Sequence, residues 1–129
     1  MAGFMTTADG TTDVTARLSY KPRDPDAIIV TITDRAGAVQ IWTIGRDLLL
    51  GGLAAEGSCP AGVNRVRAWM CHHHSGPSLM IAMMTSFAAF LELDPERVAD
   101  FAAGTLRQVP QGEESRRPNL DAGLGLRTA

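Results

Sequence analysis

Apolar and polar residues alternate along part of this chain, and the alternation limits the possible folds more than any other feature of the sequence. Residues 14–20 carry Val, Ala, Leu and Tyr at every second position, which is typical of a strand with one buried face. Two β-branched runs follow at 27–33 and 39–44, separated by a turn at 34–37 with glycine in its fourth position. The pattern predicts an antiparallel sheet that includes these three strands.

The rest of the chain mixes helical and strand patterns. A short helix is predicted at 45–53, because aspartate lies in its first turn and glycine near its end. A C-terminal amphipathic helix follows Asp94, a good N-cap, with Pro95 at its first position and an apolar stripe that reaches Val109. Further strands are predicted at 65–71, 79–84 and 87–93. We therefore expect an α+β fold, an antiparallel sheet of six or seven strands with one short helix and one C-terminal helix.

The length of 129 residues is the commonest size of a single domain. We expect residues 1–13, which are small and polar, to be flexible or to form a short edge strand. Residues 14–112 are expected to form one domain, and 113–129 a flexible tail. The N-terminus lacks the basic and apolar segments of a secretory signal, and no run approaches the roughly 18 apolar residues of a membrane span. A cytoplasmic location without direct membrane insertion is therefore expected.

Charge and cysteine content argue against three classes of protein. The net charge is -2, from 12 basic and 14 acidic residues, whereas dedicated nucleic-acid and membrane-surface proteins need a basic excess. The 2 cysteines are fewer than a small disulfide-stapled domain carries. Neither a phosphate-binding loop nor a dinucleotide fingerprint occurs in the sequence. We therefore expect no nucleic-acid partner and no cofactor.

A run of three histidines, His72, His73 and His74, follows Cys71 directly. Consecutive strand residues point to opposite faces, so at most two of these imidazoles share a side, and a turn follows at 75–77. A solvated hairpin tip is the favoured interpretation. Adventitious transition-metal binding, and a metal or thiol enzyme that uses Cys71 to His74, are the alternatives. Because no nucleophile, base and oxyanion set is evident, we expect no catalytic residue, no metal site and no enzyme.

The predicted strand at 79–84 is apolar on both faces and rich in methionine. One face packs on the core, so the other needs a cover, and in so small a chain a partner subunit is a natural one. Trp42 and Trp69 lie on predicted strands, opposite Ile41 and Ala68, and are candidates either for packing of a second face or for a recognition surface. The candidate protein-interaction residues are Trp42, Arg46, Asp47, Trp69, Met80 and Met84.

Four motifs occur in order along residues 14–114 and carry a resemblance to a known family. They are L-x-Y-x-P-x-D-P-x-A at 18–27, W-x-I-G-R-D-L-L-x-x-G-L at 42–53, V-R-x-W at 66–69 and F-x-x-x-T-x-x-x-V-P-x-G-E at 101–113. Together they resemble the SsgA/SsgB-like family of actinomycete sporulation and cell-division proteins. From the residues alone, the prolines of the first motif shape a turn, and Arg46 and Asp47 begin the short helix that Gly52 ends.

The resemblance implies a fold and a function. Members of that family have a strongly bent, whirly-like antiparallel sheet with helices, and they form a bell-shaped trimer. They are non-enzymatic, help to localise the division machinery, including the tubulin-like FtsZ, and influence wall remodelling at sporulation septa. The implied protein is a non-catalytic homotrimer or other homo-oligomer whose partners are proteins of the division machinery. The whirly-like fold leaves a single-stranded nucleic-acid binder as an alternative, although such binders use a basic groove with stacking aromatics, and aromatic residues make up only 5% here.

Three departures from the family pattern indicate a divergent paralogue. Asn64 and Arg65 stand where the family has Gly-Asp, and Met70 where it has Pro, so that surface differs in charge and shape. Only Thr85 and Ser86 stand where Pro-Asp-Gly is usual, which predicts a tighter hairpin or an altered register. The N-terminal strand is expected to be short or missing, which would weaken a trimer seam.

Overall fold

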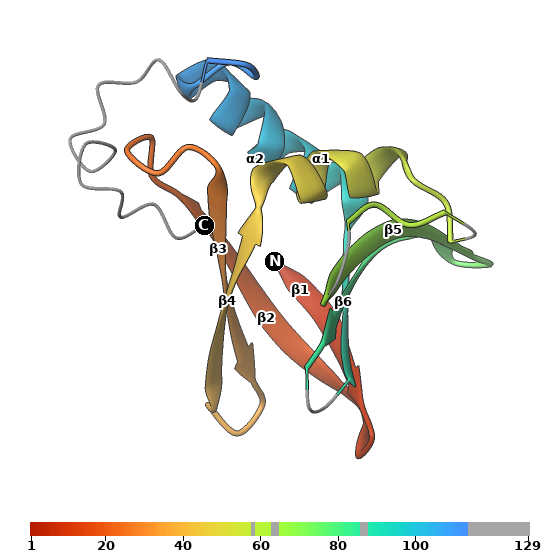
Figure 1. Ribbon diagram of the computed structural model, residues 1–129. Coiled ribbons are helices and arrows are strands. Elements are labelled where there is room, and N and C mark those ends of the chain that lie inside the picture. Colours follow the sequence, from red (N-terminus) through yellow and green to blue (C-terminus); the bar gives the residue numbers. More distant parts are fainter. Residues whose placement is uncertain (58, 63–64, 86–87, 114–129) are drawn as a thin grey trace.

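A strongly curled antiparallel sheet and a pair of helices at one end of it make up the fold (Figure 1). The computed structural model describes residues 1–57, 59–62, 65–85 and 88–113. Within these ranges, seven strands lie side by side in the order β4-β3-β2-β1-β7-β6-β5. In chain order the elements are β1 (Ala2–Thr7), β2 (Gly10–Tyr20), β3 (Ala27–Asp34), β4 (Val39–Gly45), α1 (Arg46–Ala54), β5 (Val66–His73), β6 (Gly76–Met84), β7 (Ala88–Leu93) and α2 (Pro95–Gln108). The expected α+β fold with a bent antiparallel sheet is confirmed.

The first strand departs from the expected arrangement. β1 pairs with β2 along its whole length and with β7 over four residues, so it joins the two halves of the sheet. The expectation that residues 1–13 are flexible or form an edge strand, short or missing, is therefore wrong. The local sequence does not predict this strand, because only two of its residues, Gly3 and Met5, are buried and they form no clear apolar alternation. A Cβ at Gly3 would lie 2.7 Å from the carbonyl oxygen of Glu92, so the close contact of β1 with β7 needs glycine.

The core fills the space between the inner face of the sheet and the helices. Every second residue of a strand points inward, and the inward residues of β3 are aliphatic and buried. In β6, Leu79 and Ile81 are fully buried, whereas Met80 and Met84 lie on the outer face, and Met84 is 45% exposed. As predicted, this strand is apolar on both faces, and only one of them belongs to the core.

A buried arginine ties the two helices together. Arg46 begins α1 and is 1% exposed. Its Nη1 donates hydrogen bonds to the backbone oxygens of Thr105 (3.2 Å) and Val109 (2.6 Å), at the C-terminal end of α2. The same nitrogen donates to the hydroxyl of Tyr20 over 3.3 Å. Because a positive charge is favourable at a helix C-terminus, Arg46 holds α2 against α1 at the end of the sheet.

The helices begin where their sequences predict, but α1 does not end at Gly52 as expected: it continues to Ala54, and Ala55 is its C-cap. The side chain of Asp94 accepts a hydrogen bond from the backbone N–H of Glu96 over 3.0 Å, with Pro95 at the first helical position. α1 crosses β5 at Gly52, where a Cβ would lie only 2.5 Å from the Cβ of Ala68. Glycine is therefore needed for α1 to approach the sheet this closely. Of the helices described, none is long and apolar enough to cross a membrane.

The histidine run lies at a hairpin tip, as predicted. β5 ends at His73 and β6 begins at Gly76, and all three histidines are exposed. The hairpin expected at Thr85 and Ser86 includes residues that the structure does not describe, and of the tail expected at 113–129, residues 114–129 lie outside the described residues.

Candidate protein-interaction surface

Two of the six candidate residues are internal and do not reach a partner protein. Trp42 is 7% exposed and donates a hydrogen bond from Nε1 to Oε1 of Gln40 over 3.3 Å. Arg46 is bonded to α2 as described above. Asp47 is exposed in the first turn of α1, where a carboxylate favours the start of a helix. The interaction role expected for Trp42 and Arg46 is therefore corrected to a structural one, because both side chains are buried within the chain itself.

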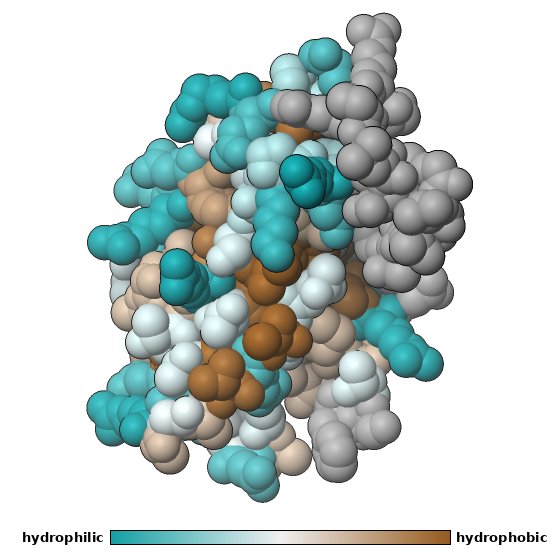
Figure 2. All heavy atoms as spheres, turned by 90° about the vertical axis from the view of Figure 1, so that its left-hand side faces the viewer, coloured by the Kyte–Doolittle hydropathy of each residue, from teal (hydrophilic) through white to brown (hydrophobic). Residues whose placement is uncertain are grey.

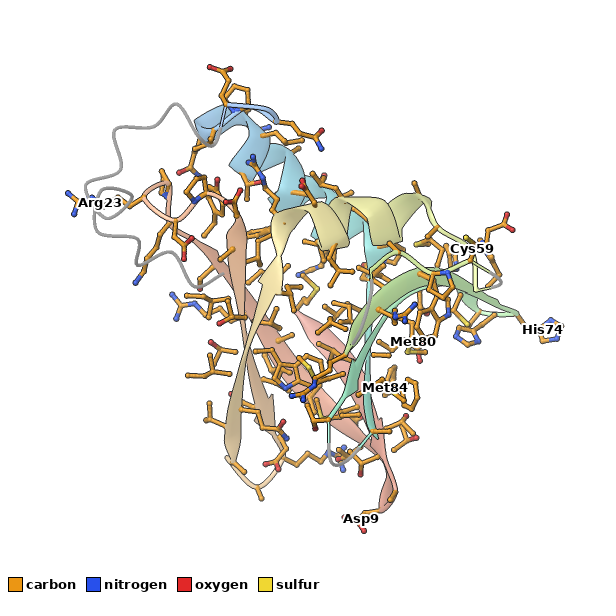
Figure 3. The ribbon with its side chains drawn as sticks, in the orientation of Figure 1. Asp9, Arg23, Cys59, His74, Met80 and Met84 are labelled. Atoms are coloured by element: carbon orange, nitrogen blue, oxygen red, sulfur yellow. The ribbon has the colours of Figure 1, made fainter. Side chains whose placement is uncertain are left out.

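The other three candidates share the outer face of β5 and β6. Figure 3 labels the two methionines on β6. Trp69 is paired directly with Met80 across these strands, and Met84 lies further along the same face of β6. The same face includes Arg67 from β5 and Phe90 from β7, which both lie beside Ala82 in the register. These five residues, Arg67, Trp69, Met80, Met84 and Phe90, are called the Met face below.

Arg67 and Phe90 were not among the sequence candidates, although a signal exists for the first of them. Arg67 precedes Trp69 by two positions, so strand alternation places both side chains on one face. Phe90 reaches the Met face through the register of β6 with β7, which pairs it with Ala82. No local pattern in the sequence predicts that register, because two neighbouring strands can slip by two residues without changing the face of any side chain.

Arg67 gives the Met face a partly buried arginine side chain. Its Nε is buried, and none of the described residues accepts a hydrogen bond from it. A buried donor without an acceptor costs free energy, and because this nitrogen has no exposed surface, a partner that docks on the Met face does not reach it. Methionine side chains adapt their shape to an opposing surface. The Met face therefore combines an adaptable apolar area with one partly buried arginine and two aromatic side chains, which are residue types enriched in protein interfaces.

The indole of Trp69 is held in place by the loop that follows α1. A Cβ at Gly57 would lie 3.4 Å from Cδ1 of Trp69, so the loop backbone runs in close contact with the ring. In the same loop, Ala61 exchanges both of its backbone hydrogen bonds with Ala68, over 2.8 and 3.0 Å. Trp69 is therefore a fixed aromatic group beside the more flexible methionines.

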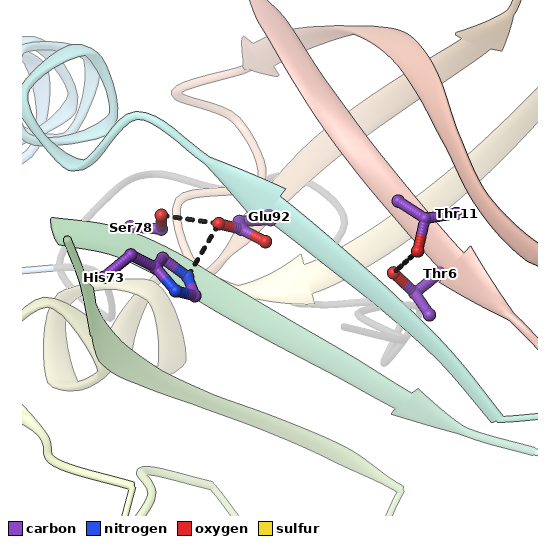
Figure 4. A network of polar contacts seen from close by, with 5 residues as sticks. All are labelled: Thr6, Thr11, His73, Ser78 and Glu92. Atoms are coloured by element: carbon purple, nitrogen blue, oxygen red, sulfur yellow. Dashed lines mark hydrogen bonds and ion pairs between the residues drawn. The ribbon is translucent and has the colours of Figure 1, made fainter. Parts of the chain in front are cut away.

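A polar network lies next to the Met face (Figure 4). Oε2 of Glu92 accepts a 2.6 Å hydrogen bond from the hydroxyl of Ser78 and lies 3.0 Å from Nε2 of His73. In a serine-hydrolase triad the imidazole lies between the hydroxyl and the carboxylate. Here the carboxylate lies between the other two groups, so the imidazole is not placed to take the proton of Ser78. This network joins β5, β6 and β7, much as the 2.9 Å bond between the hydroxyls of Thr6 and Thr11 joins β1 to β2.

The histidine-rich tip was the sequence's remaining candidate for metal or thiol chemistry. The hollow beside it is lined by Phe4, His72, His73, His74, Ser75 and Glu92. Across the part of the chain that the structure describes, no group of three or more His, Cys, Asp or Glu side chains is arranged to hold a metal ion. Cys71, half-buried on β5, and Cys59, exposed in the preceding loop, are free thiols. The described residues therefore lend no support to a metal or thiol enzyme.

A second apolar area, on the outer face of β4, was not among the sequence candidates. Ile41 is 66% exposed and Val39 is 56% exposed. Figure 2 views this side of the molecule and shows hydrophobic side chains at the surface among hydrophilic ones. The sequence contains partial evidence for this area, because the consecutive residues Ile41 and Trp42 are both apolar and point to opposite faces of the strand. It indicates two apolar faces but does not say which one belongs to the core.

Known proteins with similar sequences take part in sporulation. Residues 14–114 match a family described as Streptomyces sporulation and cell division protein, SsgA. The chain is 33% identical over 114 residues to the sporulation-specific cell division protein SsgB of Frankia casuarinae, a match that covers 88% of this chain and 77% of that protein.

Solved structures of related proteins share the fold. One comes from work on mutations in SsgB that correlate to longitudinal cell division during sporulation of Streptomyces coelicolor. It superposes with a TM-score of 0.77 at 28% identity, covering 90% of this chain and 91% of that one. An SsgA-like sporulation-specific cell division protein from Thermobifida fusca superposes with a TM-score of 0.78 at 24% identity, covering 97% and 91% of the two chains.

Proposed function

The chain belongs to the SsgA family of Streptomyces sporulation and cell division proteins, and on that premise we propose that it is a non-catalytic, oligomeric adaptor. It acts in the cytoplasm at division septa, where it helps to localise FtsZ and the septation machinery or the cell-wall remodelling machinery. Its relatives are named as sporulation-specific cell division proteins. The adaptor role is the step that this proposal adds for the present chain.

The Met face is the observation that carries the proposal. It joins the indole of Trp69 to the adaptable side chains of Met80 and Met84 and to the guanidinium-bearing side chain of Arg67. Aromatic residues, methionine and arginine are the residue types enriched in protein interfaces. A partner that offers an apolar surface would bury the methionines and the indole together. The Met face is thus the seam at which this chain meets another protein subunit.

Oligomerisation is part of the same proposal. β6 is apolar on both faces, and the helices and the inner face of the sheet cover only one of them. A further subunit on the Met face would bury the other face, and the resemblance to the SsgA/SsgB-like family favours a homotrimer. The single-stranded nucleic-acid alternative has no matching observation, because the net charge is -2 and Trp42 is in the core.

The proposal is tested by placing a charge on the Met face. Met80→Lys is expected to reduce the subunit number measured by light scattering, because an ammonium group next to Trp69 would have to be desolvated in the seam. In a sporulating host, a fluorescent fusion of the wild-type chain should concentrate at septa, and the Met80→Lys fusion should be diffuse.

Ala99→Lys is the matched control, since it adds the same charge at an exposed position of α2. It should keep the subunit number and the septal position of the wild type. A wild-type fusion that stays diffuse throughout septation, together with a deletion that leaves division unchanged, would refute the adaptor role. A wild-type chain that is monomeric in solution would refute the oligomeric part.

A further inference from the structure

The fold protects one edge of its sheet and leaves the other open. At the β5 edge, Ala68 exchanges backbone hydrogen bonds with Ala61, and the N–H of Met70 donates to the carbonyl of Ala55 over 2.8 Å. The loop after α1 therefore covers this edge. At the opposite edge, β4, none of the described residues bonds to the outward side of the strand. Exposed edge strands pair readily with other chains. The open edge of β4, which is seven residues long, is therefore a site at which a second strand can add to the sheet.

Two backbone hydrogen bonds determine which residues of β4 face the open edge. The N–H of Asp34 donates to the carbonyl of Ala38 over 3.0 Å, and the N–H of Arg46 donates to the carbonyl of Asp26 over 2.7 Å. Both bonds fit the register of β3 with β4. Bonded and non-bonded pairs alternate in an antiparallel ladder, so the even-numbered residues of β4 bond to β3. The odd-numbered residues, Val39, Ile41 and Thr43, direct their N–H and C=O groups outward.

The same three residues carry the exposed side chains of the strand. Ile41 is 66% exposed, Val39 is 56% exposed, and Thr43 is also exposed. All three are β-branched, a type that favours strand pairing. The segment 39–45 contains no charged residue, so a second strand of identical sequence would meet no like charge. This edge is therefore complementary to a copy of itself.

We propose that β4 pairs with β4 of a second copy of this chain, antiparallel and centred on Ile41. In this register Ile41 lies opposite its own counterpart, and Val39 lies opposite Thr43, so every outward N–H and C=O of these residues finds a partner. The charges flanking the strand are also complementary. Arg35, which pairs with Asp13 over 2.9 Å and has a side chain that is 79% exposed, precedes the strand, and the exposed Asp47 follows it. Antiparallel pairing brings Arg35 of one copy towards Asp47 of the other.

This contact is separate from the Met face and extends the sheet across a two-fold axis. A symmetric contact of this kind closes at two copies. Where its two-fold axis crosses the symmetry axis of the unit that the Met face assembles, it doubles that unit, and it holds whether or not the adaptor role is correct.

Cysteine pairing tests the register directly, in a background with Cys59→Ser and Cys71→Ser. Ile41→Cys places two thiols on opposite residues whose Cα atoms are about 5.5 Å apart, within the roughly 4.4–6.8 Å that a disulfide spans. Thr43→Cys is the matched control, because its counterpart lies four residues further along, about 13 Å away. Mild oxidation should give at least about tenfold more covalent dimer with Ile41→Cys than with Thr43→Cys. Equal yields from the two variants, or no dimer with Ile41→Cys, would overturn the proposal.

Ile41→Lys tests the same contact without cross-linking. It places two ammonium groups at the centre of the pairing, and the particle mass measured by light scattering should fall to half while far-UV circular dichroism stays unchanged. Met80→Lys should leave the β4-linked pair intact, so the two interfaces are judged independently. An unchanged mass for Ile41→Lys would overturn the proposal and would leave the open edge to a strand from a different protein.

Discussion

Replacing Arg46 by methionine removes the charge that joins α1 to the C-terminal end of α2. The side chain is 1% exposed and donates to the backbone oxygens of Thr105 and Val109 over 3.2 and 2.6 Å. Methionine fills a similar volume but offers no donor, so both carbonyl groups lose their bond to the guanidinium. The favourable interaction of a positive charge with the end of α2 is lost as well.

The expected magnitude follows from these contacts. Hydrogen bonds from a charged donor contribute about 1.5–3 kcal/mol each, and the guanidinium makes two such bonds to backbone carbonyl groups. We expect Arg46→Met to lower the free energy of unfolding by about 3–5 kcal/mol, a large part of the roughly 5–15 kcal/mol that stabilises a typical domain. The free energy of unfolding of Arg46→Lys should lie between those of the wild type and Arg46→Met, because one ammonium group lacks the rigid fork that reaches several acceptors.

Urea unfolding followed by circular dichroism measures this difference. Arg97→Met is the matched control, because Arg97 is exposed near the start of α2 and its removal should change the free energy of unfolding by no more than about 0.5 kcal/mol. A value for Arg46→Met within about 1 kcal/mol of the wild type would refute the reasoning. It would mean that the helices are held by apolar packing alone.

Other substitutions probe the packing, with the same urea assay. Gly52→Ala should lower the free energy of unfolding by about 1–3 kcal/mol, because its Cβ would lie 2.5 Å from the Cβ of Ala68; an unchanged stability would contradict that close contact. Gly104→Ala, inside α2, should raise it by about 0.5–1 kcal/mol, since the nearest atom to its new Cβ is a guanidinium nitrogen 3.6 Å away. Trp42→Phe should lower it by about 1–2 kcal/mol, because the hydrogen bond to Gln40 and part of the core volume are lost; a more stable variant would show that the indole is strained.

The sequence by itself determined most of the elements. Alternation marked the strands from β2 to β4, and the capping residues Asp94 and Pro95 marked the start of α2. These signals are local, because strand period and helix caps depend on residues a few positions apart. Four short motifs in order were also enough for the family resemblance, and the family match over residues 14–114 confirmed it.

Only the tertiary structure decided how the strands are used. β1 has few inward apolar residues, and its central place depends on pairing with β2 and β7, which comes from distant parts of the chain. The motif residues Trp42 and Arg46, chosen as interaction candidates, lie inside the molecule, while Ile41 lies outside. Alternation separates the two faces of a strand but assigns neither to the core when both are apolar. That assignment depends on the curl of the sheet and on which face the helices cover, and the open edge of β4 depends on the order of the strands.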